Sequence, residues 1–248
     1  MKILRRNTWL IAIGLLLSGC TTTSPTFLNP NSMISTKEVA LYRFVLVEAA
    51  FFFVVIIAAL LWILIRYRRS GNDKSLAPQI HGKVAWALIP VMLILVFDGG
   101  DFYEMVKTMN AVAAPPAATH DINLHVIGHR WWWEFDYPDL GFKTANELHI
   151  PVGANVKITL SSVDVIHSFW VPQLSGKTDV IPGQINHMWL TSDQVGTFLG
   201  QCSEFCGTEH ALMRIKVIVQ SQADFDAWVA NQQQSAPQPQ TADEIAGY

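Results

Sequence analysis

Two thiols, one imidazole and one thioether lie within twelve residues of one another near the end of the 248-residue chain. These side chains, in the segment QCSEFCGTEHALM, are Cys202, Cys206, His210 and Met213. Thiolates and thioethers prefer copper or zinc to the harder cations that oxygen ligands bind, and imidazole suits both of these metals. A second imidazole is available from His167 in the segment DVIHSFWVP. The spacing therefore predicts a soft-metal site on a loop between two strands.

Other interpretations of this loop are open from its residues alone. Cys202 and Cys206 could form a disulfide if the domain is exported. Two cysteines and two histidines could instead hold structural zinc in a closed tetrahedral site. Met213 has no place in such a zinc site, although a lone methionine more often fills a core than binds a metal. Beside the thiols and the imidazoles, this methionine favours copper.

Three segments resemble subunit II of haem-copper cytochrome c oxidase, the subunit that holds the binuclear copper A centre. The segments are DVIHSFWVP, GKTDVIPG and GQCSEFCGTEHALM, and the resemblance extends from about residue 40 to residue 228. It implies that two copper ions share the thiolates of Cys202 and Cys206. The other ligands that it implies are His167, His210, Met213 and the backbone carbonyl of Glu204.

The same resemblance implies roles in electron transfer and docking. The segment GHRWWWEFDYP places Trp131 where electrons enter from cytochrome c, and His210 lies on the side where they leave. Asp136 and Asp164 fall where family members place acidic docking residues. The carboxylate of Glu204 would help to bind magnesium or manganese at the contact with subunit I.

Three positions depart from the family pattern. Arg130 and Trp132 stand where glutamine and tyrosine are commoner in the family. Lys83, three residues before Trp86, stands where many members carry a glutamate near a proton entrance to subunit I. The resemblance therefore does not extend to proton uptake at this position.

The first twenty residues have the pattern of an export signal. Three basic residues, Lys2, Arg5 and Arg6, precede an apolar run that ends in small residues. The sequence Leu17-Ser-Gly-Cys20 resembles a bacterial lipoprotein cleavage site, which makes Cys20 the candidate lipidated residue. An ordinary or uncleaved signal with an incidental cysteine is the alternative.

Two apolar segments predict a transmembrane hairpin. Residues 44–65 are interrupted only by Glu48 and match the ~20 residues that a helix needs to cross a bilayer. The apolar run over residues 84–97 is shorter than this, so a helix there can cross the bilayer only if flanking residues, which include Asp98, are also part of the span. Ionisable residues at membrane depth usually face protein or water, so these two acids predict a membrane partner. Lysine and arginine dominate the intervening loop, which places it in the cytoplasm and the metal loop outside.

Beyond an Ala- and Pro-rich linker the sequence becomes strand-like. Short apolar or alternating runs separated by Gly, Pro and Asn predict an antiparallel sandwich or barrel. The runs are residues 121–127, 131–137, 155–160, 163–169, 185–190, 196–200 and 213–219. The family resemblance sharpens this expectation to an all-β, cupredoxin-like Greek-key domain that follows the two-helix hairpin.

These observations predict the following organisation, in chain order. We expect a lipoprotein-type signal peptide (1–20), a periplasmic segment (21–40), a first transmembrane helix (41–66), a cytoplasmic loop (67–82), a second transmembrane helix (83–108), a linker (109–119), the cupredoxin-like copper A domain (120–222), a C-terminal helix (223–232) and a disordered tail (233–248).

Charge differs between the two parts of the chain. Residues 120–248 contain six Lys and Arg against fourteen Asp and Glu, whereas residues 1–119 contain eleven against six. An acidic domain speeds encounter with a basic partner such as cytochrome c, although a generic solubilising surface is the simpler explanation.

The resemblance predicts subunit II of a respiratory cytochrome c oxidase in the bacterial inner membrane, with its copper domain on the periplasmic side. It would pass electrons from cytochrome c to haem in subunit I, with subunit III as a further partner and no nucleic-acid partner. The complex would reduce dioxygen to water and translocate protons, but this chain would hold no dioxygen-reducing site. A copper A subunit of a nitric oxide reductase and a copper-free membrane-anchored binding module are the alternatives.

Overall fold

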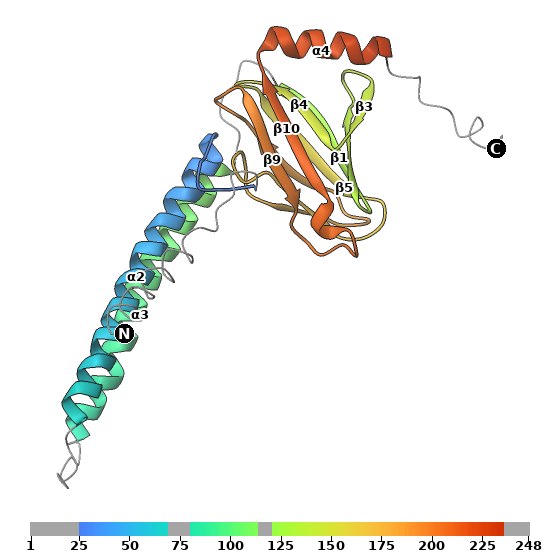
Figure 1. The fold of residues 1–248 in the computed structure, drawn as a ribbon. Helices are drawn as coiled ribbons and strands as arrows, with labels where there is room; N and C mark the ends of the chain where they lie inside the picture. The colour runs from blue at the N-terminus through green and yellow to red at the C-terminus, as the bar shows by residue number, and fades with distance from the viewer. Residues whose placement is uncertain (1–24, 69–79, 114–120, 236–248) are drawn as a thin grey trace, which may run out of the picture.

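The computed structural model describes residues 25–68, 80–113 and 121–235. The predicted signal peptide with Cys20 lies outside these residues, as do most of the predicted cytoplasmic loop, most of the linker and nearly all of the predicted tail. The described residues form a long helical hairpin that is joined at one end to a β domain (Figure 1).

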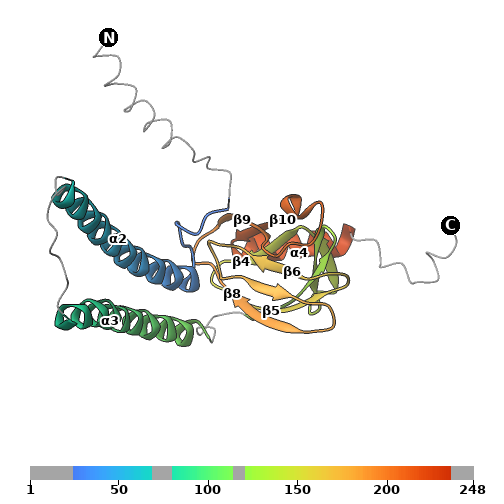
Figure 2. The same ribbon diagram turned by 90° about the horizontal axis from the view of Figure 1, so that it is seen from below.

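Helices α2 (Met33–Tyr67) and α3 (Ile80–Val112) run antiparallel as the two legs of the hairpin (Figure 2). Midway along the legs, the ring of Phe97 packs edge-on against Phe52, with their centroids 4.7 Å apart. Both helices extend beyond the predicted spans of 41–66 and 83–108. Among the described residues, Met33–Arg66 is a helix long and apolar enough to cross a membrane.

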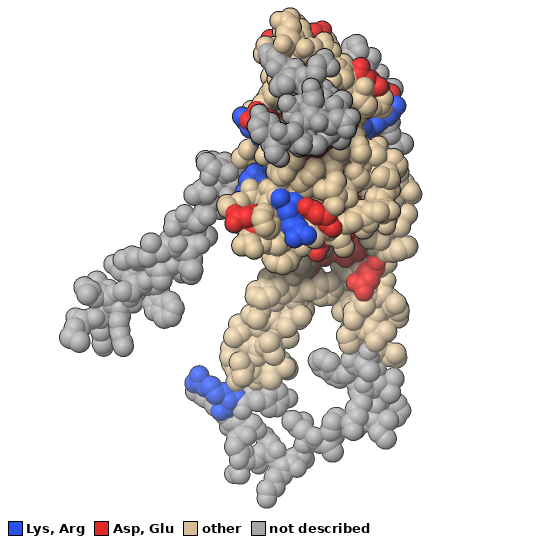
Figure 3. Space-filling view, turned by 90° about the vertical axis from the view of Figure 1, so that its right-hand side faces the viewer, with Lys and Arg blue, Asp and Glu red and all other residues tan. Residues whose placement is uncertain are grey.

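The surface of the hairpin agrees with a membrane environment. Most large apolar side chains of α2 between Phe44 and Ile65 are exposed rather than packed inside the protein. On the face in Figure 3, the described parts of both legs carry few charged side chains along their length. Basic side chains appear at the end of one leg away from the β domain, where Arg66 and Arg68 end α2.

Two five-stranded sheets form the β domain, in the orders β3-β2-β1-β5-β8 and β4-β10-β9-β6-β7. The strands are β1 (Asp121–His129), β2 (Trp132–Tyr137), β3 (Phe142–Ala145), β4 (Glu147–Pro151), β5 (Asn155–Ser162), β6 (His167–Trp170), β7 (Thr178–Val180), β8 (Asn186–Leu190), β9 (Gly196–Cys202) and β10 (Arg214–Gln220). The core lies between the sheets and includes Trp133, Phe135, Leu148, Phe169 and Val217, all with 0% exposure. The expected all-β domain is therefore confirmed, as two sheets packed on one core.

The expectation of a purely antiparallel sandwich is wrong for two strand pairs. Strand β1 pairs in parallel with β5, and β4 pairs in parallel with β10. Each parallel pair joins strands that are far apart in the sequence. The alternation of apolar residues determines which face of a strand is buried, but it carries no information on the direction of the neighbouring strand.

Helix α4 (Gln222–Ser235) closes the domain and is longer than the predicted 223–232. Phe225 of this helix is buried, and the ring of Trp228 stacks on His149 with centroids 4.1 Å apart. The apolar positions of this short helix therefore cover one end of the core.

Hydrogen bonds attach the β domain to both legs of the hairpin. Ser32 is the N-cap of α2, and its Oγ donates to the carbonyl of Leu174 at 2.5 Å. The hydroxyl of Ser35 donates to the carbonyl of Gln173 at 2.7 Å. At the end of α3, the indole of Trp189 donates to the carbonyl of Val112 at 3.0 Å. The domain is thus attached at the start of one leg and at the end of the other.

Candidate metal centre

The predicted metal loop connects β9 to β10, which pair as an antiparallel hairpin. Cys202 is the last residue of β9, and its backbone N–H donates to the carbonyl of Met213 at 3.0 Å. Between them, His210 begins a single turn of 3-10 helix. The two ends of the loop are therefore held together by the sheet, which fixes its first and last candidate ligands relative to each other.

His167 reaches the same place from the neighbouring strand. It is the first residue of β6, which pairs with β9 so that Phe169 lies opposite Cys202. The side chain of His167 is fully buried, and Cys202, Cys206 and Met213 are buried beside it. Strand pairing thus brings His167, thirty-five positions before Cys202, to the loop.

The candidate donor atoms form a chain with the two thiols at its centre. The Sγ atoms of Cys202 and Cys206 lie 3.8 Å apart, and both thiols are free. Cys202 Sγ lies 3.9 Å from Nδ1 of His167 and 3.2 Å from the carbonyl oxygen of Glu204. Cys206 Sγ lies 3.6 Å from Nδ1 of His210 and 3.8 Å from Sδ of Met213. Each thiol therefore has one imidazole and one further donor beside it.

The two thiols differ in their tendency to ionise. Burial opposes ionisation of Cys202, but contacts with His167, Glu204 and the backbone of Ser168 outweigh it and lower the pKa to about 6. Burial and the neighbouring charge of Cys202 raise the pKa of Cys206 to about 12. A metal that binds both thiolates must therefore displace the proton of Cys206.

Asp164 supports the buried histidine. Its Oδ1 lies 2.9 Å from Nε2 of His167 and accepts from the backbone N–H of Val165 at 2.6 Å. Its Oδ2 accepts from the backbone N–H of Arg130 at 2.7 Å. Burial opposes ionisation of this carboxyl, but these hydrogen bonds outweigh it and lower its pKa. The predicted strand over 163–169 is interrupted here, because Asp164 turns the chain ahead of β6.

The three consecutive tryptophans have three different environments. Trp131 precedes β2, and its Nε1 donates to the carbonyl of Cys206 at 3.2 Å. Trp132 points away from the core and stacks on His129 with centroids 4.2 Å apart, whereas Trp133 is fully buried. Trp131 lies in the turn before the strand and packs, partly buried, against the core.

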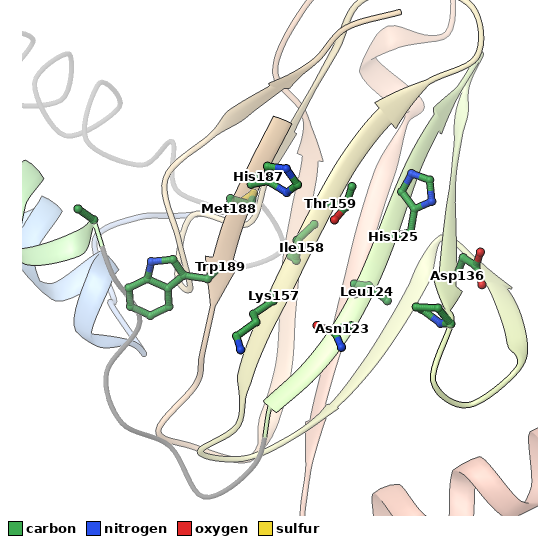
Figure 4. Close-up of a pocket in the computed structure, with 12 residues that line it drawn as sticks. Asn123, Leu124, His125, Asp136, Lys157, Ile158, Thr159, His187, Met188 and Trp189 are labelled. Carbon is green, nitrogen blue, oxygen red and sulfur yellow. The ribbon is translucent and has the colours of Figure 1, made fainter. Parts of the chain in front are cut away.

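Asp136 lies away from the donor cluster. It faces outward from β2, with its carboxylate 3.8 Å from Nζ of Lys143. There it lines an open groove of about 570 Å³ on the outer face of the first sheet, together with His125, Thr159 and His187 (Figure 4). The two predicted docking acids therefore have unlike surroundings, since Asp164 contacts a candidate ligand and Asp136 does not.

The loop presents apolar side chains to the exterior beside the buried donors. Phe205 and Leu212 are 75% and 69% exposed, and each precedes a candidate ligand. Glu204 is also exposed, so its carboxylate is free to contact another molecule while its carbonyl faces Cys202. Sequence reasoning did not anticipate this apolar rim, although the positions of Phe205 and Leu212 within the loop gave a signal.

Comparisons of the amino-acid sequence show which known proteins this chain resembles. The sequence profile of the family described as "Cytochrome C oxidase subunit II, periplasmic domain" matches residues 142–221, which contain all six candidate metal ligands. Cytochrome c oxidase subunit 2 of Alkalihalophilus pseudofirmus is 37% identical over 190 residues, which cover 75% of this chain and 56% of the relative. The Arabidopsis thaliana protein of the same name is 32% identical over 73% of this chain and 80% of its own length.

Two further similarities complete the comparison. A quinol oxidase subunit 2 from Bacillus spizizenii is 30% identical over 92% of this chain and 72% of the relative. The solved periplasmic domain of cytochrome oxidase subunit II from Bradyrhizobium japonicum aligns with 49% of this chain and 99% of that chain, at 32% identity and a TM-score of 0.46. The chain spans about half the length of the first two curated relatives that it matches, 56% and 53%.

Proposed function

The chain belongs to the cytochrome c oxidase subunit II family, and we propose on that basis that its β domain holds a binuclear copper A centre. The ligands would be His167, Cys202, Cys206, His210, Met213 and the carbonyl of Glu204. When bound there, copper ions would supply one-electron redox chemistry. The chain would serve as the electron-transfer subunit of an oxidoreductase complex.

The arrangement of the donors carries the proposal for two ions rather than one. Among the described residues, His167, Cys202 and Cys206 are the one group of three or more His, Cys, Asp or Glu residues whose ligand atoms all lie within 4.8 Å of one another. Nδ1 of His210 lies 3.6 Å from Sγ of Cys206, and His210 lies outside this group. A single tetrahedral ion holds all of its ligands within one small sphere. Two ions that share the thiols would use both histidines.

The surrounding residues suit electron relay. Burial of His167 and Met213 and the closed ends of the loop restrict movement of the ligands, which keeps reorganisation small. Trp131 contacts the loop through the carbonyl of Cys206, so it is the proposed point where electrons enter from cytochrome c. His210 is less buried than His167 and is the proposed exit toward haem in subunit I.

The remaining partners follow from the same proposal. The exposed Glu204 carboxylate would bind magnesium or manganese at the contact with subunit I, and subunit III would complete the membrane assembly. Both hairpin helices would span the bacterial inner membrane, with the β domain outside and Cys20 lipidated. Asp136 and Asp164 would add negative charge for docking of a basic cytochrome c. Reduction of dioxygen and proton translocation would take place in the partner subunits.

Copper content and the electron paramagnetic resonance spectrum of the full-length chain test the copper proposal. We expect two copper ions per chain and one unpaired electron shared by both. Cys202→Ser and Cys206→Ser should each abolish the shared signal, whereas Cys20→Ser should leave it unchanged. A single-copper signal, bound zinc or a disulfide between Cys202 and Cys206 would contradict the proposal.

The quinol oxidase relative supports one alternative, a copper-free binding module with the same fold. The complete set of soft donors beside the thiol pair argues for copper instead. A chain that binds no copper, yet associates with a membrane-embedded oxidase subunit, would favour the binding module.

A further inference from the structure

We infer that Asp164 is a positioning residue that holds His167 in the orientation required for metal binding. The inference rests on the proposed copper function and changes the role of Asp164 within it. Family resemblance assigns this aspartate to docking of cytochrome c. The structure surrounds its carboxylate with groups from this chain, and its side chain is 22% exposed.

Both oxygens of the Asp164 carboxylate have partners. Oδ1 is within hydrogen-bonding distance of Val165 N at 2.6 Å and His167 Nε2 at 2.9 Å. Oδ2 accepts from Arg130 N at 2.7 Å, and Nε of the same arginine lies 3.9 Å away. A carboxylate has about four lone-pair sites. Three of those of Asp164 already have hydrogen-bonding partners inside the protein, so it has less to offer an incoming cation.

The contact with His167 fixes one tautomer of the imidazole. Nδ1 faces Cys202 and is the nitrogen available to a metal, so Nε2 carries the proton that is donated to Asp164. Such a carboxylate orients the ring and raises the basicity of the ligating nitrogen. The ring is further enclosed by Gly128, where an added Cβ would lie 2.8 Å from Cδ2 of His167.

His210 lacks an equivalent support within the described part of the chain. Its Nδ1 faces Cys206, and the exposed ring of Phe205 lies 5.8 Å away, centroid to centroid. The two proposed histidine ligands are therefore not equivalent. His167 is held by a carboxylate inside the domain, and His210 is left open toward the exterior.

Asp164 also connects His167 to Trp131, the tryptophan that contacts the loop. It binds the backbone of Arg130, and the next residue, Trp131, donates to the carbonyl of Cys206. A continuous set of contacts thus runs from His167 through Asp164 and Arg130 to Trp131 and the loop. Loss of the carboxylate should therefore loosen two residues at once: His167, the proposed ligand, and Trp131, the proposed point of electron entry.

The test compares Asp164→Asn, Asp164→Glu and the matched control Asp136→Asn in the full-length chain. Copper affinity and the copper spectrum are measured with no cytochrome c present, and the rate of reduction by cytochrome c is measured separately. We expect Asp164→Asn to weaken copper binding about 10- to 100-fold and to change the hyperfine pattern of the copper spectrum. Asp164→Glu keeps the negative charge but displaces the carboxylate, so it should weaken copper binding as well. Asp136→Asn removes a charge that contacts no candidate ligand, so its copper affinity and copper spectrum should match those of the wild type.

Three outcomes separate the possibilities. Wild-type copper affinity and spectrum in both Asp164 variants, with slower reduction by cytochrome c in Asp164→Asn alone, would establish a docking role and overturn the inference. A wild-type chain that binds no copper pair would overturn both the proposed function and the inference. Weakened copper binding in both Asp164 variants, beside an unchanged Asp136→Asn, would support positioning.

Discussion

Trp131 makes one polar contact that links it to the candidate metal loop, the hydrogen bond from Nε1 to the carbonyl of Cys206. Trp131→Phe should keep an aromatic ring there but lose this bond, which costs about 0.5–1.5 kcal/mol of stability. We expect unchanged copper content and slower reduction by cytochrome c, measured by stopped-flow absorbance. Trp132→Phe, on the outer face, is the control. Equal slowing in both variants would argue against Trp131 as the electron acceptor.

Gly207 lies close to the indole of Trp131. Its φ is +121°, and an added Cβ would lie 3.1 Å from Nε1 of Trp131. Gly207→Ala should therefore cost about 1–3 kcal/mol from backbone strain, and the displaced tryptophan should change its fluorescence. Gly153→Ala is a suitable control, because Gly153 also has a positive φ, +74°, but has open space around its Cβ position. A fluorescence change of equal size in the control would show that the contact with Trp131 is unimportant.

At the scale of elements, Glu134 connects three neighbouring strands. From β2 it reaches Lys143 of β3 at 2.7 Å and His129 of β1 at 3.2 Å. Burial opposes ionisation of Glu134, but its contacts with Lys143 and His129 outweigh burial and lower its pKa below the ordinary value of 4.5. Because the pKa is lower in the folded state, the stabilisation is present above pH 4.5 and is lost as the pH falls through the folded-state pKa.

This linkage predicts that the free energy of unfolding of Glu134→Gln falls less steeply in acid than that of the wild type. The wild type should lose up to about 1 kcal/mol from this group as the pH is lowered, as measured by chemical unfolding at a series of pH values. Glu147→Gln, which breaks the exposed pair with Lys216, controls for the loss of one surface charge. If the free energy of unfolding of Glu134→Gln falls in acid as steeply as that of the wild type, Glu134 does not provide this stabilisation.

The same scale explains what could be predicted from sequence. The loop donors Cys202, Cys206, His210 and Met213 are close in sequence, and a hairpin loop brings such residues together without distant contacts. His167 reaches the loop through the pairing of β6 with β9. The sequence offered it as a second imidazole, and the family resemblance implied that it is a ligand. The positioning role inferred for Asp164 could not be predicted, because the local sequence does not show whether an aspartate before a strand faces water or a histidine.

Strand direction was beyond prediction for a related reason. The parallel pairs β1–β5 and β4–β10 bring together segments separated by whole hairpins. Burial patterns along each strand were readable, as in β2, where alternate residues are buried. Pairing between distant strands depends on how the sheets pack, and no local pattern encodes it.

At the scale of the whole molecule, the junction between hairpin and β domain is built on buried hydroxyl groups. Ser32 is 1% exposed, caps α2 and donates to the carbonyl of Leu174. Ser32→Ala removes both interactions, and loss of the cap alone costs about 1 kcal/mol. We expect faster amide exchange at the start of α2 and in the segment around Leu174, with an unchanged copper spectrum.

The matched control for this junction is Ser221→Ala. Ser221 accepts from the backbone N–H of Asp224 in the first turn of α4, far along the chain from the hairpin, so the variant loses a cap without touching the junction. Exchange around Leu174 should remain slow in this control. A Ser32→Ala chain with unchanged exchange at the junction would show that the hydroxyl does not hold the two parts together.

The place of β10 in the second sheet has a consequence for the order of assembly. This strand lies between β4 and β9 and begins one residue after Met213, so the sheet is incomplete until about residue 220 has been synthesised. The hairpin helices, by contrast, are finished by residue 112. Because a domain generally folds as a unit, the candidate ligands gather only after β10 has been made. The full set of candidate ligands therefore becomes available to a metal only once β10 has taken its place in the sheet.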